Sequence, residues 1–243
     1  MSIKEATKKI LGSVNLLEPT RKLLWDIDRR FGRIDWQIAE QYLSQSKPRK
    51  LHIGCGQNQL SSWLNADYFP LSKEVLHLDA TQRFPFDDDI FDYAYSEHMI
   101  EHISYTDGLK MLSECYRVLQ PSGRIRISTP DLAFLVGLYN KDKSPLQKNY
   151  IKWSSQTYKG VLKDNETFVI NNFVRDWGHT FIYDESTLKE AMIYAGFTDI
   201  TKCDLGVSKD AALSNLENEA RLPLGFLRLE SFILEGTKRI RPT

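Results

Sequence analysis

A short apolar segment that ends in two closely spaced glycines constrains this chain more than any other feature. Residues 49–58 read RKLHIGCGQN, in which Leu51 and Ile53 precede Gly54 and Gly56. This pattern predicts a buried strand that breaks into a tight turn. Glycine suits such a turn because the backbone can adopt positive φ there, or because a ligand can approach the main chain closely. Open α/β sheets bind nucleotide-like ligands at this kind of junction, although the third glycine of a dinucleotide fingerprint is absent.

Length and composition place the chain among globular proteins with one large domain. The 243 residues are 42% apolar and 26% charged, and 32 basic side chains balance 32 acidic ones. Zero net charge gives no reason to expect nucleic acid as a partner. The basic runs at residues 47–50 and 238–241 are short, so we expect at most a weak peripheral contact with a membrane. No apolar stretch reaches the ~20 residues needed to span a bilayer, and three widely spaced cysteines predict free thiols in the cytoplasm.

Hydrophobic patterning predicts an α/β architecture for residues 47–243. Short apolar runs bounded by turn residues predict strands at about 50–53, 63–67, 75–79, 91–96, 124–129, 198–205 and 228–236. Helical periodicity predicts helices at about 106–119 and 184–195, with Thr106 and Asp184 as their N-caps. Residues 131–180 lack a strand pattern, so we expect them to form an inserted cap of helices and loops over the sheet edge.

The first two connections between strands are too short to hold a helix. Each spans about ten residues, whereas a full helical crossover between parallel strands needs about a dozen or more. One face of this half of the sheet should therefore lack its usual helices. Residues 1–46 are predicted to form an N-terminal helical segment, whose apolar stripe at about 21–43 needs a partner. We expect that segment to cover the open face.

Four stretches, in this order, resemble class I S-adenosylmethionine-dependent methyltransferases. They are LHIGCG at 51–56, LNAD at 64–67, the run from HLD to EHI at 77–103, and LSECYRVLQPSGRIRIST at 112–129. The resemblance is to the type-11-like branch, which is often found among genes for surface polysaccharides. It implies a Rossmann-like, doubly wound sheet of seven mostly parallel strands, with shortened early crossovers and an inserted cap. It also implies S-adenosylmethionine as the cofactor.

The resemblance assigns cofactor-binding roles to residues at the ends of the first four strands. They are Gly54, Cys55 and Gly56 at the methionine part, Asp67 at the ribose hydroxyls, Asp79 and Ala80 at the adenine edge, and Ser96 and Glu97 beside the transferable methyl. A carboxylate suits the ribose because it can accept a hydrogen bond from each hydroxyl of a diol. The alternatives are that the two aspartates only close turns and that Ser96 and Glu97 only end a strand.

The implied activity is methyl transfer to a small molecule or glycan precursor, with the hydroxyl of a sugar as the expected acceptor. A hydroxyl acceptor needs a base, and the candidates are His98, His102 and His179. Polar and aromatic groups just before the last helix are the candidates for acceptor binding, namely Arg175, Asp176 and Trp177. The sequence does not indicate an oligomeric state.

Two alternatives compete with this interpretation. His52 stands where an acid often precedes the glycine turn, and the helix after the turn is nearly absent, so the chain could be a non-catalytic module with the same fold. In addition, residues 98–102 fit H-x-x-E-H, the inverted zinc-protease motif, in which His98 and His102 of one helix face would bind zinc beside Glu101. The methyltransferase interpretation requires no metal.

Overall fold

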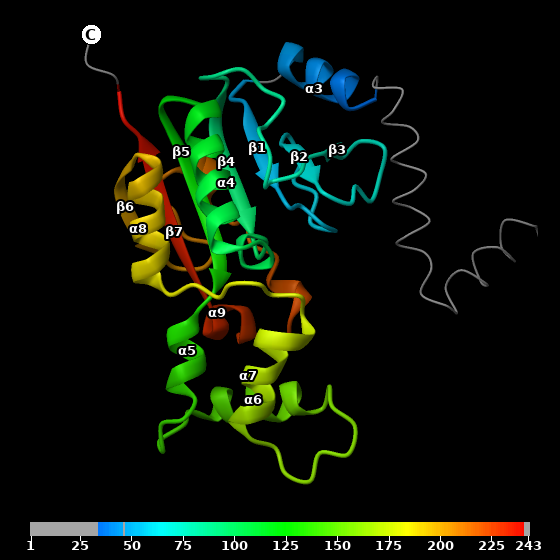
Figure 1. Cartoon of the computed structure of the whole chain (residues 1–243), viewed down its shortest axis with the longest axis vertical. Coiled ribbons are helices and arrows are strands. Elements are labelled where there is room, and N and C mark those ends of the chain that lie inside the picture. The colour runs from blue at the N-terminus through cyan, green and yellow to red at the C-terminus, as the bar shows by residue number, and fades with distance from the viewer. Residues whose placement is uncertain (1–33, 46, 241–243) are drawn as a thin grey trace, which may run out of the picture.

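The computed structural model describes residues 34–45 and 47–240, and a seven-stranded sheet runs through its centre (Figure 1). Along the sheet the strands follow the order β3-β2-β1-β4-β5-β7-β6. Neighbouring strands are parallel, except that β7 runs antiparallel to both β5 and β6. The predicted doubly wound sheet of seven mostly parallel strands is therefore confirmed.

The elements lie close to where the sequence predicts them. The strands are β1 (Lys50–Ile53), β2 (Leu64–Asp67), β3 (Leu76–His77), β4 (Phe91–Glu97), β5 (Leu119–Pro130), β6 (Phe197–Cys203) and β7 (Ser231–Lys238). The helices are α3 (Ile34–Gln45), α4 (Tyr105–Val118), α5 (Leu132–Gly137), α6 (Pro145–Ser155), α7 (Glu166–Asn171), α8 (Glu185–Ala195) and α9 (Phe226–Glu230). Single turns are η1 (Ile100–His102), η2 (Asn172–Asp176), η3 (Ala211–Leu213) and η4 (Glu219–Arg221). None of these helices is both long and apolar enough to cross a bilayer.

Several boundaries differ from the predictions; β3 and β6 end earlier than predicted, and three further differences change how an element begins or bends. Ser104 rather than Thr106 is the N-cap of α4, because the Ser104 hydroxyl accepts the N–H of Asp107 at 3.1 Å. The bend at residues 121–123 lies inside β5 instead of before it, with Ser122 at a φ of 68°. Residues 228–230 are helical, so β7 begins only at Ser231.

Two long helices cover one face of the sheet. Alternate residues of β1 and β5, such as Leu51 and Ile127, contact the buried stripe of α4 and α8 in the main hydrophobic cluster. That stripe follows the helical period, as in Met111, Leu112 and Cys115 of α4. The first two crossovers contain no helix, as predicted.

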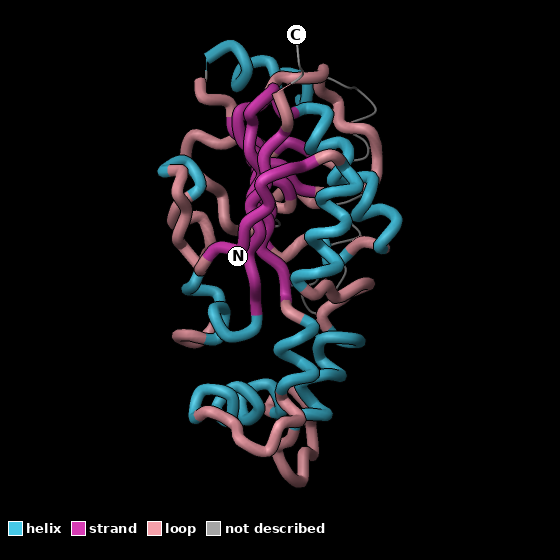
Figure 2. Tube along the Cα trace, turned by 90° about the vertical axis from the view of Figure 1, so that its left-hand side faces the viewer, coloured by secondary structure: helices cyan, strands magenta, loops and turns pink. Residues whose placement is uncertain are grey.

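The opposite face carries loops and single turns instead of long helices (Figure 2). The expectation that the N-terminal segment covers this face is wrong for the described part, because α3 packs against the same cluster as α4, through Ile38, Ala39, Tyr42 and Leu43. Residues 21–33 lie outside the described part of the chain. The chain between β6 and α9 covers the open face in their place, and its Leu213 and Leu216 pack on Trp63 and Tyr95.

A row of polar side chains crosses the sheet beneath this covering chain. Asn65, His52, Tyr95, Arg126 and Glu235 occupy paired positions on β2, β1, β4, β5 and β7. The Arg126 guanidinium is completely buried and forms ion pairs with Glu217 of the covering chain and with Glu235, each at 2.6 Å. Because buried charges need partners, this pairing attaches the covering chain to the sheet.

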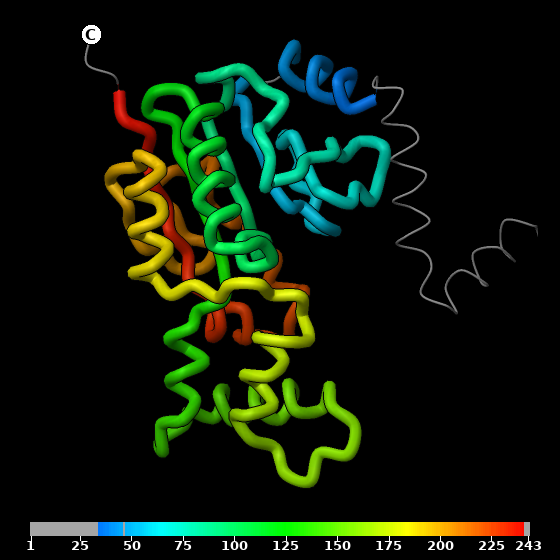
Figure 3. The backbone as a smooth tube through the Cα atoms, viewed as in Figure 1, coloured from blue at the N-terminus to red at the C-terminus, as the bar shows by residue number. Residues whose placement is uncertain are grey.

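The predicted inserted cap is present between β5 and α8. Figure 3 shows the chain leaving β5, passing through α5, α6 and α7 beyond the end of the sheet, and returning to α8. The cap has its own hydrophobic cluster, in which Tyr150, Val169 and Phe173 pack with Phe226 of α9. This arrangement places the cap next to the carboxyl ends of β4 and β5, where doubly wound folds bind ligands.

Candidate functional site

A cavity of about 640 Å³ lies at the carboxyl ends of β1, β2 and β3, and we call it the strand-end cavity. Among the residues predicted to bind the cofactor, Gly54, Gly56, Asp67, Asp79 and Ala80 line it. Because β1, β2 and β4 pair in parallel register, their last residues meet at this edge of the sheet. The sequence prediction and the cavity therefore coincide for these five residues.

The turn after β1 needs both of its glycines, for different reasons. Gly54 has a φ of 71°, and a Cβ on it would lie 2.3 Å from Cγ of Met99. Gly56 has a φ of 49°, but a Cβ there would meet no atom within 4 Å. Gly54 is thus required by protein packing, whereas Gly56 leaves open space at the cavity wall that a ligand can occupy.

Two aspartates are held in place at the rim of the strand-end cavity. Asp67 accepts hydrogen bonds from the backbone N–H groups of Gly56 at 2.8 Å and Phe69 at 2.7 Å, one on each carboxylate oxygen. Asp79 accepts from the N–H and the hydroxyl of Thr81 through a single oxygen, Oδ1. Each carboxylate oxygen has more than one lone pair, so both aspartates can still accept hydrogen bonds from a ligand.

The three other residues predicted to contact the cofactor do not line the strand-end cavity, so their roles stay predictions. Cys55 points into the protein, and burial raises the pKa of its thiol to about 12. The Ser96 hydroxyl is buried without a hydrogen-bond partner in the described part of the chain. Glu97 accepts hydrogen bonds from the Asn58 side chain and the Asn218 backbone, which link the glycine turn to the covering chain.

A second cavity of about 370 Å³ lies between the end of the sheet and the cap, and we call it the cap cavity. Its wall combines aromatic rings with charged and polar groups from His98, Glu101, His102, Pro130, Trp153, Thr157, Phe173, Trp177, His179, Arg221, Leu222 and Glu230. Two residues, His98 and His102, line both cavities. The two cavities are therefore neighbours, with the two imidazoles at their boundary.

His98 is held in an unusual conformation directly after β4. Its φ is 46°, which is uncommon for a residue other than glycine. Nε2 lies 2.7 Å from the Ser231 hydroxyl, and Nδ1 lies 3.3 Å from Oε1 of Glu101. Glu101 is completely buried and also accepts the Thr129 hydroxyl at 3.1 Å. Burial opposes the ionised form of Glu101, but the hydrogen bond from His98, together with the neighbouring imidazoles and backbone, outweighs it and lowers the pKa of the carboxyl.

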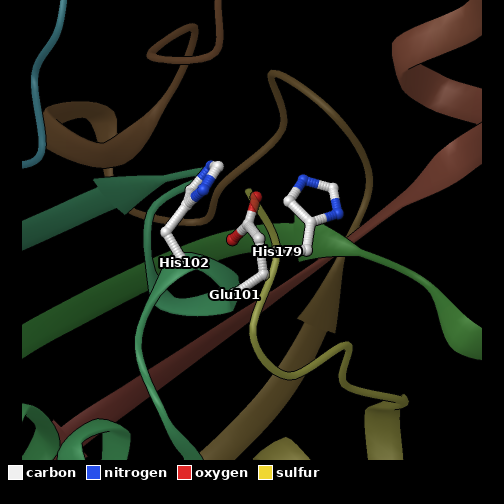
Figure 4. A group of neighbouring side chains, drawn as sticks. All are labelled: Glu101, His102 and His179. Carbon is white, nitrogen blue, oxygen red and sulfur yellow. The ribbon is translucent and has the colours of Figure 1, made fainter. Parts of the chain in front are cut away.

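Glu101, His102 and His179 form a compact group at the cap cavity (Figure 4). One nitrogen or oxygen atom from each residue lies within 4.8 Å of the other two. His102 Nδ1 is 3.2 Å from the carbonyl oxygen of Gly178. Burial lowers the pKa of His179, which favours the neutral form of its imidazole.

A further buried acid, Glu230, lies in the wall of the cap cavity. Tyr150 donates a short hydrogen bond to its carboxylate, and the Arg221 guanidinium lies 4.0 Å away. Burial raises the pKa of Glu230. The cap cavity thus offers a carboxyl group and a guanidinium next to aromatic rings.

The zinc-hydrolase alternative requires His98 and His102 on one face of an α-helix. The structure has a strand end at this place, then the positive φ of His98, and then the single 3-10 turn η1, which begins at Ile100. The segment therefore lacks the helical arrangement of the H-x-x-E-H motif.

The residues predicted for acceptor binding separate into two groups. Trp177 and His179 line the cap cavity, as the prediction requires. Arg175 and Asp176 are exposed and lie outside both cavities, and Asp176 accepts the hydroxyl of Tyr158 at 2.6 Å. Contact between these two residues and an acceptor therefore requires an acceptor that extends beyond the cap cavity, and their role stays a prediction.

Among the contributors to the cap cavity that the sequence did not single out, four carry an aromatic ring or a charge. Trp153 and Phe173 come from α6 and η2, while Arg221 and Glu230 come from the chain before β7. The aromatic residues of the cap gave a compositional signal but no spacing that could select individual positions. Arg221 and Glu230 gave no signal in the sequence, because only the tertiary fold brings them to the cap.

The strand order, the glycine turn after β1 and the acid at the end of β2 are those of the class I S-adenosylmethionine-dependent methyltransferases that the sequence resembles. Residues 51–127, from β1 into β5, match the family model described as "Methyltransferase domain". Residues 51–127 therefore form a methyltransferase domain of the class I, S-adenosylmethionine-dependent kind, and the match supports S-adenosylmethionine as the cofactor. No curated protein sequence matches the chain.

Solved structures with a similar chain path include methyltransferases from several organisms. One from Thermotoga maritima, described as a possible histamine N-methyltransferase, is 16% identical, with 90% of this chain and 98% of that chain covered at a TM-score of 0.46. One from Archaeoglobus fulgidus is 18% identical, with 90% and 94% covered at a TM-score of 0.46. The phosphoethanolamine N-methyltransferase 2 of Haemonchus contortus, in complex with S-adenosyl-L-methionine, is 15% identical. The match covers 85% of this chain and 52% of that chain at a TM-score of 0.43.

Proposed function

We propose that the protein transfers the methyl group of S-adenosylmethionine to a hydroxyl group of a sugar or glycan precursor bound in the cap cavity. The observation that carries this proposal is the shared boundary of the two cavities, which His98 and His102 both line. A cofactor in the strand-end cavity and an acceptor in the cap cavity would meet at these imidazoles. Orientation of this kind can supply several kcal/mol of the barrier to a bimolecular reaction, on the order of 7–11 kcal/mol in favourable cases.

The composition of the cap cavity supports a polar acceptor with flat apolar faces. Trp153, Phe173 and Trp177 offer aromatic surfaces on which the C–H face of a sugar ring can lie. Arg221 and Glu230 offer a donor and a carboxyl group for hydroxyl groups on the edge of that ring. A few placed polar groups in an otherwise aromatic cavity are typical of sites that orient small ligands.

The chemistry needs little from the protein besides alignment and a proton acceptor. The acceptor oxygen forms a bond to the methyl carbon, the carbon–sulfur bond breaks with its electron pair going to sulfur, and S-adenosylhomocysteine leaves. The hydroxyl proton must pass to a base, for which general-base catalysis typically contributes about 10²–10⁴-fold.

Of the three candidate bases, His98 has the best orienting partners. A proton on Nδ1 can be donated to Glu101 at 3.3 Å, which leaves Nε2 as the proton acceptor. Nε2 accepts the Ser231 hydroxyl at 2.7 Å, so the hydroxyl of an acceptor could replace Ser231 there. The positive φ of His98 also supports a functional role, because strained backbone is often retained at active sites. His102 and His179 lie in the group with Glu101.

A transfer assay with labelled S-adenosylmethionine and a cell-envelope extract tests this proposal. The His98→Gln variant should lose about 10²-fold or more in the rate of label transfer. Ser231→Ala, which removes only the hydroxyl at Nε2, is the matched control and should keep most of the rate. If the protein binds the cofactor but no fraction of the extract receives label, the domain is a binding module and the proposal fails.

A further inference from the structure

We propose that Glu101, His102 and His179 bind one divalent transition-metal ion at the wall of the cap cavity. Two imidazoles and one carboxylate, with one donor atom each, lie within 4.8 Å of one another (Figure 4). This donor set is the one that holds zinc in many catalytic sites and iron in the two-histidine, one-carboxylate centres. Such sites leave open positions on the metal for water or a substrate.

The backbone holds this group together without any metal. The N–H groups of Thr180 and Phe181 donate to the Glu101 carbonyl at 2.7 and 3.1 Å, and the Thr180 hydroxyl donates to the carbonyl of His102 at 3.1 Å. These three hydrogen bonds attach the loop that carries His179 to the turn η1. The donors are therefore preorganised on two segments that are distant in the sequence.

The contacts around the donors fit those of metal ligands. His102 Nδ1 lies 3.2 Å from the carbonyl oxygen of Gly178, which fixes the proton on Nδ1 and leaves the lone pair of Nε2 available. A backbone carbonyl on the second ring nitrogen is the usual support of a metal-binding histidine. Glu101 is completely buried, and Thr129 orients its carboxylate through the second oxygen. Bonds of about 2.1 Å to a zinc-sized ion require donor atoms roughly 3.4 Å apart. Side-chain rotations that move the donor atoms by about an ångström would bring them to this spacing.

The chemistry of the donors selects the ion. Imidazole nitrogens favour zinc, iron, cobalt and nickel, whereas magnesium and calcium favour oxygen donors. The open positions would face the cap cavity, because all three residues line it. An acceptor hydroxyl bound there would lose its proton more readily, since a bound cation lowers the pKa of a coordinated oxygen acid. This last step depends on the proposed methyl transfer, but the ion site itself does not.

Titration of the metal-free protein with Co²⁺, followed by visible absorption and calorimetry, tests the inference. Wild type should bind one Co²⁺ per chain, Zn²⁺ should displace it, and Mg²⁺ should not. His179→Ala and His102→Ala should each weaken Co²⁺ binding at least 10-fold. His77→Ala, a histidine outside the group, is the matched control and should bind Co²⁺ like wild type. Circular dichroism of each variant would verify that the loss of binding is not a loss of folding.

Two comparisons separate this inference from its competitors. His98→Ala should keep the Co²⁺ site, whereas a site built on the H-x-x-E-H pair would be lost in that variant. Absence of Co²⁺ binding by wild type, or equal binding by His179→Ala, would overturn the inference. Methyl transfer that is unaffected by a chelator, with no bound ion, would refute the ion site and leave the proposed function intact. Co²⁺ binding without any methyl transfer would refute the proposed function and leave the ion site intact.

Discussion

Asp67, the last residue of β2, accepts a 2.8 Å hydrogen bond from the backbone N–H of Gly56 in the turn after β1. This bond connects the ends of β1 and β2, and it fixes the carboxylate at the rim of the strand-end cavity. One side chain thus shapes the glycine turn and leaves oxygen atoms at the cavity rim, where we predict that the ribose of S-adenosylmethionine binds.

Replacing Asp67 should weaken cofactor binding in two graded steps. Asp67→Ala removes both roles of the carboxylate and should cost about 1–3 kcal/mol in the binding free energy of S-adenosylmethionine. Asp67→Asn keeps one acceptor oxygen, so its affinity for S-adenosylmethionine should lie between those of Asp67→Ala and wild type. Isothermal calorimetry measures both, with Glu190→Ala on the exposed side of α8 as the control. Equal affinity for all four proteins would show that Asp67 does not contact the cofactor.

The close approach of Gly54 and Met99 predicts an interaction between two substitutions. Gly54→Ala should destabilise the fold by about 2–4 kcal/mol, from the strain of a left-handed alanine and from overpacking against Met99. Adding Met99→Ala in the same chain should recover the stability lost to overpacking, while the loss from backbone strain at residue 54 should remain. Urea unfolding of the two single variants and the double variant gives the coupling free energy. Purely additive effects would contradict the packing seen between these residues.

The burial of His52 predicts a loss of stability in acid. Burial lowers the pKa of His52 from 6.5 to about 4, and the hydrogen bond with Asn65 opposes this shift only in part. The unfolded chain therefore takes up a proton between these pH values, while the folded protein does not. The free energy of unfolding should therefore fall by roughly 3 kcal/mol as the pH is lowered from 6.5 towards 4.

His52→Phe isolates this contribution, because phenylalanine can keep the ring contacts with Tyr95 and cannot titrate. The Asn65 side-chain oxygen also accepts the Leu60 N–H at 2.9 Å, so it should keep a hydrogen-bond donor in this variant. Urea unfolding at several pH values should show a flatter stability profile for His52→Phe than for wild type between pH 6.5 and 4. Parallel profiles would mean that other groups cause the acid dependence.

The ion pairs of Arg126 predict a large effect on stability far from the site. Arg126→Met leaves Glu217 buried without a cation and leaves Glu235 with Arg124 as its only cationic partner, which should cost about 3–5 kcal/mol in the free energy of unfolding. Adding Glu217→Leu and Glu235→Leu should recover most of the lost stability, because apolar groups of similar volume can replace a buried ion pair. Thermal and urea unfolding check both variants. A small effect of Arg126→Met alone would indicate that the covering chain does not depend on this pairing.

Local patterns in the sequence predicted most of the sheet and the strand-end cavity. Gly54, Gly56 and Asp67 lie within or next to short apolar runs, where turn chemistry and strand ends leave a readable signal. The covering of the open face was not predictable in this way. It depends on Arg126 meeting Glu217, a contact between distant segments that periodicity does not encode.

The cap cavity was predicted only in part, for the same physical reason. Trp177 and His179 stood out by residue type, but nothing local places His179 beside Glu101. That proximity arises from the backbone hydrogen bonds of Thr180 and Phe181 to Glu101, which exist only in the folded chain. Arg221 and Glu230 reach the cavity through η4 and α9, which the sequence did not mark as part of a site.

The central claim is that the two neighbouring cavities form one methyl-transfer site. Its most direct test is the transfer of labelled methyl from S-adenosylmethionine to the sugar fraction of a cell-envelope extract by the purified protein. We predict label in that fraction with wild type and a strong reduction with Asp67→Ala and with His98→Gln. Cofactor binding by wild type in calorimetry, together with no label in any fraction, would contradict the claim and identify a module that binds the cofactor without using it.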